Sequence, residues 1–235
     1  MRIRVALAVV TVLAALAPLS FAAFEPKGEW DGFGQGSWVL MKTTSKTITA
    51  DMQVPDTVTE MRKTLTKVTD AEWVVTMETK AGDTWGVSTP MTLPRVAPKG
   101  APDPKDMPKV EELGADKVTI EGKDYACKKQ KVSFMGDVGL SWVSEEHGEL
   151  KWESTEADGS TTRREVTSLA KKVKAAGKEV TCRETKTVAK PAGIDTTIVV
   201  LASDDLPGHL VRMESTEAGA VKTNTVTEVV AFEIK

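Results

Sequence analysis

The feature that most constrains the fold is an internal repeat, a sequence unit that occurs twice between Val118 and Phe232. Both copies carry the same markers in the same order: Gly-Lys, Cys, Ser, Gly, Leu and Glu-Ser-Thr-Glu-Ala. They fall at Gly122-Lys123, Cys127, Ser144, Gly148, Leu150 and 153–157, and again at Gly177-Lys178, Cys182, Ser203, Gly208, Leu210 and 214–218. The offset grows from 55 to 61 residues, so the insertions lie between matched segments. Such self-similarity indicates a fold assembled from equivalent units.

Each copy predicts four strands, because Thr- and Val-rich alternating runs are separated by glycine-containing turns. The predicted strands are Tyr125–Phe134, Leu140–Ser144, Glu149–Thr155, Thr161–Leu169, Val180–Val188, Thr196–Ala202, Leu210–Thr216 and Val221–Ile234. The N-terminal part adds Ser37–Thr44, Thr57–Thr69, Glu72–Thr79 and a strand from Thr84. Met77–Gly82 echoes 213–219, which would make this part a degenerate third copy. We predict an all-β antiparallel meander of about 10–12 strands, built from two or three repeats and forming a strongly curved sheet or a partly closed barrel.

The chain divides into six predicted segments. These are a signal peptide (1–22), a flexible lead-in (23–36), an N-terminal β segment (37–93), a Pro/Lys-rich loop or linker (94–114), repeat 1 (115–170) and repeat 2 (171–235). Five prolines between Pro94 and Pro108 exclude a regular ladder there. Val110–Gly114 is expected to add one helical turn.

The first 22 residues have the pattern of a secretory signal. Arg2 and Arg4 precede the apolar run Val5–Leu16, and Ser20-Phe21-Ala22 gives the small-x-small cleavage pattern. We therefore expect export to the periplasm or cell surface of a bacterium, with no transmembrane segment in the mature chain. Losing two arginines changes the net charge from −3 to −5. This acidity disfavours nucleic acid as a partner.

The only two cysteines, Cys127 and Cys182, occupy equivalent positions in the copies. Export favours a disulfide between them. In a simple meander, however, equivalent strands lie roughly 19 Å apart, whereas a disulfide needs a Cα separation of roughly 5–6 Å. The sequence is therefore compatible with a disulfide and with two separate buried thiols.

The tryptophans and methionines are the candidate ligand-binding residues. On the concave face of a curved sheet they could line an apolar cavity, and otherwise they fill the core. The candidate set is Trp38, Trp73, Trp85, Trp142, Trp152 and Met213.

Candidate catalytic and metal-binding groups are weak by comparison. His147 and His209 lie beside acidic residues in turns, and Glu153, Glu156, Glu214 and Glu217 have the pattern of a solvent-facing strand surface. No nucleophile or zinc motif occurs. We predict no catalytic residue, no metal site and no cofactor.

The order Gly-Lys-x-x-x-Cys, Trp142-Val143-Ser144 and Leu-Val-Arg-Met-Glu (210–214) resembles uncharacterised exported bacterial β-repeat proteins. More distantly, it resembles the curved-sheet carriers of the periplasmic lipoprotein-carrier type. That resemblance implies a half-barrel sheet whose concave face holds acyl chains.

The leading functional hypothesis is a non-enzymatic exported protein that binds an apolar ligand, or another envelope protein, on its concave face. The alternative is a structural or scaffolding protein of the cell envelope. A hydrolase with an unrecognised site is the third.

Overall fold

The computed structural model describes residues 28–49, 54–86, 88–95, 108–134, 137–156, 158–191, 194–219 and 221–235. The predicted signal peptide lies outside these ranges. The strands are β1 (Trp38–Ile48), β2 (Thr57–Val68), β3 (Glu72–Ala81), β4 (Thr84–Trp85), β5 (Thr89–Pro94), β6 (Lys109–Ile120), β7 (Lys123–Phe134), β8 (Asp137–Ser144), β9 (Gly148–Thr155), β10 (Thr161–Ala175), β11 (Lys178–Lys190), β12 (Asp195–Ala202), β13 (Leu210–Ala218) and β14 (Lys222–Glu233). Across these ranges the structure has no helix able to cross a membrane.

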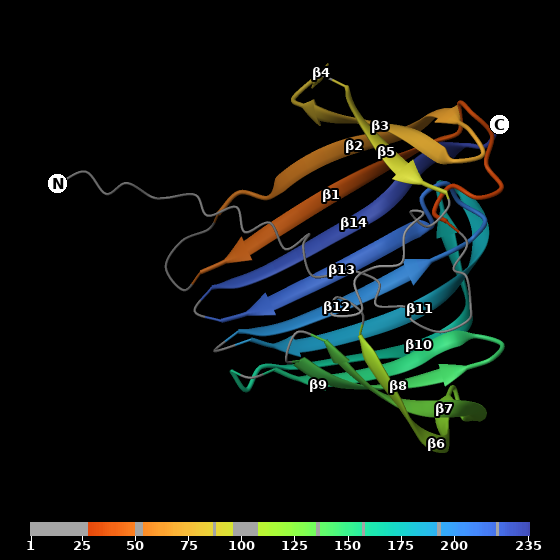
Figure 1. Cartoon of the computed structure of the whole chain (residues 1–235). Helices are drawn as coiled ribbons and strands as arrows, with labels where there is room; N and C mark the ends of the chain where they lie inside the picture. The colour runs from red at the N-terminus through yellow and green to blue at the C-terminus, as the bar shows by residue number, and fades with distance from the viewer. Residues whose placement is uncertain are drawn as a thin grey trace.

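All strands belong to one antiparallel sheet, in the order β4-β3-β2-β1-β14-β13-β12-β11-β10-β9-β8-β7-β6, with β5 also pairing β3. Figure 1 shows this sheet bent into a deep arc that stays open between its two edges. The predicted fold class, an antiparallel meander in a strongly curved sheet, is confirmed. The two additional strands are β5 and β6. Strand β6 begins at Lys109, inside the segment predicted as a loop, so Val110–Gly114 is extended and not a helical turn.

The middle of the sheet joins the two ends of the chain. β1 pairs with β14 from Trp38↔Glu233 to Ile48↔Lys222. Beside this ladder, the Lys235 amide donates to Ser37 Oγ over 3.0 Å, and the Gly34 amide donates to the Lys235 carbonyl over 3.1 Å. As a result β5 and β6, which are consecutive in the sequence, lie at opposite edges.

The structure places the repeat markers at equivalent points. Gly122 and Gly177 both have a φ of 80° and follow a residue of positive φ in the β6–β7 and β10–β11 turns. Such two-residue turns match the twist of the strands they join. Cys127 lies opposite Asp116 as Cys182 lies opposite Lys171. The third, degenerate copy remains a prediction.

Three hydrophobic clusters form the core. The chain-end cluster consists of Trp30, Val39, Met41, Leu65, Trp73, Val75 and Val229. The first-copy cluster consists of Ile120, Cys127, Trp142, Leu150 and Val166. The second-copy cluster consists of Ala175, Val180, Cys182, Leu201, Leu206 and Val211. Residues 28–36, expected to be a flexible lead-in, instead pack on the sheet: the Trp30 side chain is 1% exposed and Phe33 contacts the chain-end cluster.

The clusters sit where the long strands bend. The ladder between β10 and β11 is irregular between Val166 and Lys171, and beyond this point β10 comes into contact with β14. In the same way β6 contacts β10, which lies four strands away in the sheet. Each hairpin end thus covers apolar side chains that a flat sheet would leave in water.

We expect Leu65→Ala to lower the free energy of unfolding by about 2–5 kcal/mol, because Leu65 is fully buried and its removal leaves a cavity. Urea unfolding followed by circular dichroism measures this change. Val58→Ala on the same strand is the control, since Val58 is 54% exposed and should change stability by no more than about 0.5 kcal/mol. Equal losses from both variants would contradict this account of the core.

Candidate functional site: the two faces of the sheet

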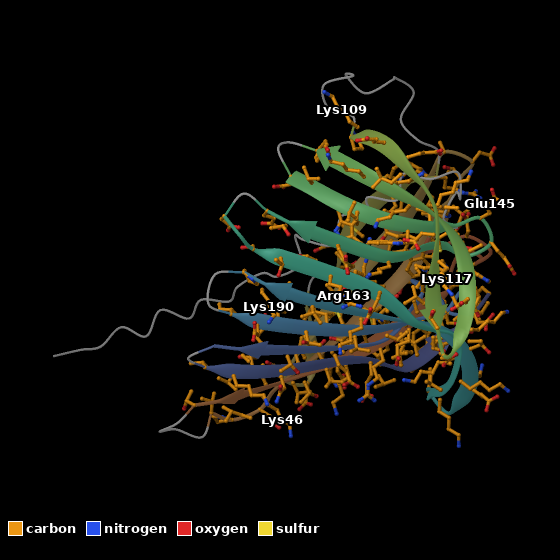
Figure 2. All side chains as sticks on the ribbon, turned by 90° about the horizontal axis from the view of Figure 1, so that it is seen from below. Lys46, Lys109, Lys117, Glu145, Arg163 and Lys190 are labelled. Carbon is orange, nitrogen blue, oxygen red and sulfur yellow. The ribbon has the colours of Figure 1, made fainter. Side chains whose placement is uncertain are left out.

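Neighbouring residues of a strand point to opposite faces, so the pairing register divides the sheet into two surfaces. Figure 2 shows Lys46, Arg163 and Lys190 on the convex side of the arc. We call this surface the outer face, and the surface of opposite parity the inner face.

One unbroken register row crosses ten strands on the inner face, from β2 to β7. It consists of Thr57, Ser45, Thr225, Ser215, Ile198, Thr187, Arg164, Trp152, Ser141 and Gln130. Only one of these ten side chains, Arg164, is charged, and on the edge strand β6 the next residue of the row, opposite Gln130, is the charged Glu112. The next row towards the bent end of the sheet, Thr59, Thr43, Thr227, Met213, Val200 and Thr185, has no charge. The inner face is therefore a band of hydroxyl and apolar groups.

Two hydroxyl pairs of this band bond across the ladder between β1 and β14. Thr43 Oγ1 lies 2.9 Å from Thr227 Oγ1, and Ser45 Oγ lies 3.2 Å from Thr225 Oγ1. Cross-strand Thr and Ser pairs of this kind stabilise a sheet. Because these four hydroxyl groups already have partners, a ligand on this face need not supply hydrogen bonds to them.

The adjacent row on the outer face has the opposite character. It consists of Val58, Thr44, Val226, Glu214, Val199, Lys186, Glu165, Lys151, Trp142 and Lys129, of which five are charged. Ion pairs hold many of the charges on this face, among them Arg62–Glu78, Lys80–Glu60, Lys151–Glu153, Arg163–Glu165 and Arg212–Glu214. This is the composition of a water-facing surface.

The single charge in the inner row is neutralised by a carboxylate. Arg164 donates to Glu149 Oε1, and Ser141 Oγ donates to Glu149 Oε2 over 2.9 Å. Nearby, Arg183 donates to the carbonyls of His147 and Glu149. Burial lowers the pKa of the Arg183 guanidinium. These bonds fix the corner where β8, β9, β10 and β11 bend.

Three of the six tryptophan and methionine candidates, Trp38, Trp85 and Trp142, lie on the outer face, and Trp73 has the parity of the inner face but is buried in the chain-end cluster. The Trp38 indole donates to Glu233 over 2.9 Å, and Trp85 stacks with the Arg62 guanidinium at 5.1 Å. Trp73 and Trp142 are each 5% exposed and belong to the core. The structure therefore does not gather the six into one cavity.

Trp152 and Met213 lie on the inner face. The Trp152 ring rests on Gly139, where an added Cβ would come within 2.2 Å of the ring, so only glycine fits. The inner-face residues that sequence reasoning missed are Ile198, Val200 and the hydroxyl rows. In β12 both parities are apolar, so alternation gave no signal of which side faces inward.

The two histidines each stack on an aromatic ring. Among the residues that the structure describes, no group of three or more His, Cys, Asp and Glu side chains is arranged to hold an ion. His147 stacks edge-on against Tyr125, with ring centroids 5.3 Å apart. His209 stacks against Phe33 at 6.5 Å. Both rings are packed into the bent end of the sheet.

In the structure the two cysteines are separate thiols. Cys127 and Cys182 are both free and buried, and each belongs to the cluster of its own copy. Strands β8, β9 and β10 lie between their strands, a separation of roughly 19 Å along the sheet. Burial raises the pKa of both thiols, which keeps them protonated and weakly reactive.

We expect the mature protein to retain both thiol hydrogens in its intact mass. Iodoacetamide should label neither cysteine until denaturant is added, and a reducing agent should leave the melting temperature unchanged. A mass lower by two hydrogens, with a melting temperature that falls on reduction, would instead establish a Cys127–Cys182 bond.

No protein-family model and no curated protein matches the sequence. Among solved structures, it is similar to a LolA superfamily protein from Nitrosomonas europaea (TM-score 0.29, 12% identity, covering 89% of this chain and 90% of that one). It is also similar to a domain described as an outer membrane lipoprotein-sorting protein from Vibrio parahaemolyticus (TM-score 0.32, 10% identity, 86% of each chain). A third is described as a thioesterase II from Thermobifida fusca (TM-score 0.20, 8% identity, 84% of this chain and 79% of that one).

The first two are of the lipoprotein-carrier type that the sequence distantly resembles. All three TM-scores are below 0.5, so these similarities say nothing about the function of this chain.

Proposed function

We propose that the chain is a non-enzymatic exported protein that binds an elongated, largely apolar ligand, such as an acyl chain, along the inner face of its sheet. The observation that carries this proposal is the contrast between adjacent register rows. The inner row has one charged side chain in ten, and the outer row has five in ten. A sheet face that lacks charges is normally covered by another layer.

The described residues contain no such layer over the inner rows. The three buried clusters lie at the bent end of the sheet, while Ile198, Val200, Met213 and Trp152 are only half-buried. The inner row with its single charge crosses ten strands, which corresponds to about 43 Å at the usual strand spacing. An extended apolar chain fits this shape better than a compact ligand does.

The test uses neighbouring residues of β12 that face opposite ways. Ile198→Glu places a carboxylate in the middle of the inner face, and Val199→Glu places the same group on the outer face. We expect Ile198→Glu to weaken binding of a dansyl-labelled fatty acid by about tenfold or more, because an unpaired charge is costly beside an apolar ligand. Fluorescence titration measures the affinity, and Val199→Glu should bind as the unmodified protein does.

Native mass spectrometry of mature protein exported in bacteria supplies an independent readout. An added mass that organic extraction removes, and that Ile198→Glu lacks, is the expected result. A bare polypeptide mass together with equal titrations for both variants would exclude the inner face as an acyl-chain site. The scaffold alternative would then remain.

A further inference from the structure

A groove of about 410 Å³ lies on the outer face, where the β10–β11 hairpin bends over β12, β13 and β14. Leu201 and Val211 form an apolar part of its lining, and both are less than 10% exposed. Its rim is charged and includes Lys171, Glu184, Arg212 and Glu228. The volume is within the roughly 300–1,000 Å³ typical of ligand pockets. This groove lies on the opposite face from the proposed acyl-chain site.

The internal repeat identifies the equivalent place in the first copy. The outer-face row there is Lys129, Trp142, Lys151 and Glu165. In the second copy it is Glu184, Leu201, Arg212 and Glu228. The register supports this match, because Lys151 pairs with Glu153 at 2.9 Å just as Arg212 pairs with Glu214 at 2.7 Å. Leu201 therefore stands where the first copy has Trp142.

In the first copy the indole of Trp142 fills this place. Its Nε1 donates to Asp116 Oδ2 over 2.8 Å. The ring lies between two ammonium groups, with Lys129 Nζ 4.8 Å and Lys151 Nζ 4.4 Å from its centroid. The side chain is 5% exposed as a result. The same backbone arrangement thus accommodates an indole, with cations against its faces and a carboxylate at its N–H.

The second copy keeps one cation of this place, has Glu184 where the first copy has Lys129, and lacks the ring. Arg212 stands in the position of Lys151 and is held by Glu214 at 2.7 Å and Glu228 at 3.5 Å. Lys171 stands in the position of Asp116 and binds Glu184, so a carboxylate again lies beside the groove. A guanidinium attracts an aromatic face, and a carboxylate oxygen that already has one donor can accept another.

We propose that this groove binds the side chain of a tryptophan presented by another polypeptide. An apolar centre that takes one aromatic anchor, surrounded by a polar and charged rim, is the usual anatomy of a protein–protein contact. The groove has this anatomy, and it lies open on the outer face. The indole would lie on Leu201 and Val211, with Arg212 against one face and its N–H directed to Glu184.

The test is a methyl NMR titration of the mature protein with the pentapeptide Gly-Gly-Trp-Gly-Gly, with Gly-Gly-Leu-Gly-Gly as its control. We expect saturable shifts of the Leu201 and Val211 methyl signals with the tryptophan peptide only. The Leu140 methyls, which lie beside the filled place of the first copy, should not move.

Leu201→Trp should fill the groove from within and abolish these shifts, and the first copy shows that the backbone accepts a tryptophan there. Ile198→Trp, on the opposite face, is the matched control and should keep the shifts. Arg212→Ala should weaken binding by about 2- to 30-fold, the range of a cation–π contact. Fatty-acid binding by Leu201→Trp should be unchanged, which separates this site from the inner-face site.

The absence of any saturable shift would overturn the proposal. Equal binding of the leucine peptide, or undiminished binding by Leu201→Trp, would overturn it as well. If N-acetyl-tryptophanamide binds but the pentapeptide does not, the groove recognises a free small aromatic molecule, and the polypeptide partner is excluded.

Discussion

The ladder between β1 and β14 is the constraint on which the rest of the structure depends. It joins residues almost two hundred positions apart, and without it the sheet would separate into β2–β5 with β1 on one side and β6–β14 on the other. The chain-end cluster forms only across this ladder, because Val39 and Leu65 come from one part and Val229 from the other. Forming such a distant pairing costs chain entropy that the packing must offset. The burial of Trp30 and the bonds at Lys235 supply part of that compensation.

Because the sheet has a single layer, its buried side chains are concentrated where the strands bend. The hairpin ends of β6–β7 and β10–β11 each cover their own apolar cluster. This solves the packing problem locally and leaves the long middle of the inner face without a protein partner in the described structure. The same division explains the chemistry of the two faces. The outer face is covered with ion pairs, while the inner face keeps hydroxyl groups that bond to each other and half-buried Ile, Val and Met side chains. The proposed ligand site is therefore the middle of the inner face, which none of the three buried clusters covers.

The two copies show how one backbone arrangement can serve two purposes. The row around Trp142 is closed, with the indole bonded to Asp116 and enclosed by two lysines. In the equivalent row Leu201 is smaller, the acid is replaced by Lys171, and an open groove remains. The cysteines did not diverge in this way. Each remains a small buried group in its own cluster, which accounts for their matched positions without a disulfide.

The sequence by itself determined the all-β class, most strand positions and the hairpin turns, because alternation and glycine with positive φ act over a few neighbouring residues. It also determined the equivalence of Gly122 with Gly177 and of Cys127 with Cys182. Only the tertiary structure decided that β1 pairs with β14, that residues 28–36 pack on the sheet, and that β6 continues the ladder at one edge.

The tertiary structure also decided which side of each strand faces inward. In β12 both Ile198 and Val199 are apolar, and Trp142 and Trp152 lie only ten positions apart, yet each pair is divided between the two faces. Strand parity is a local property, but the direction in which a sheet curves depends on pairings and bends distributed over the whole chain.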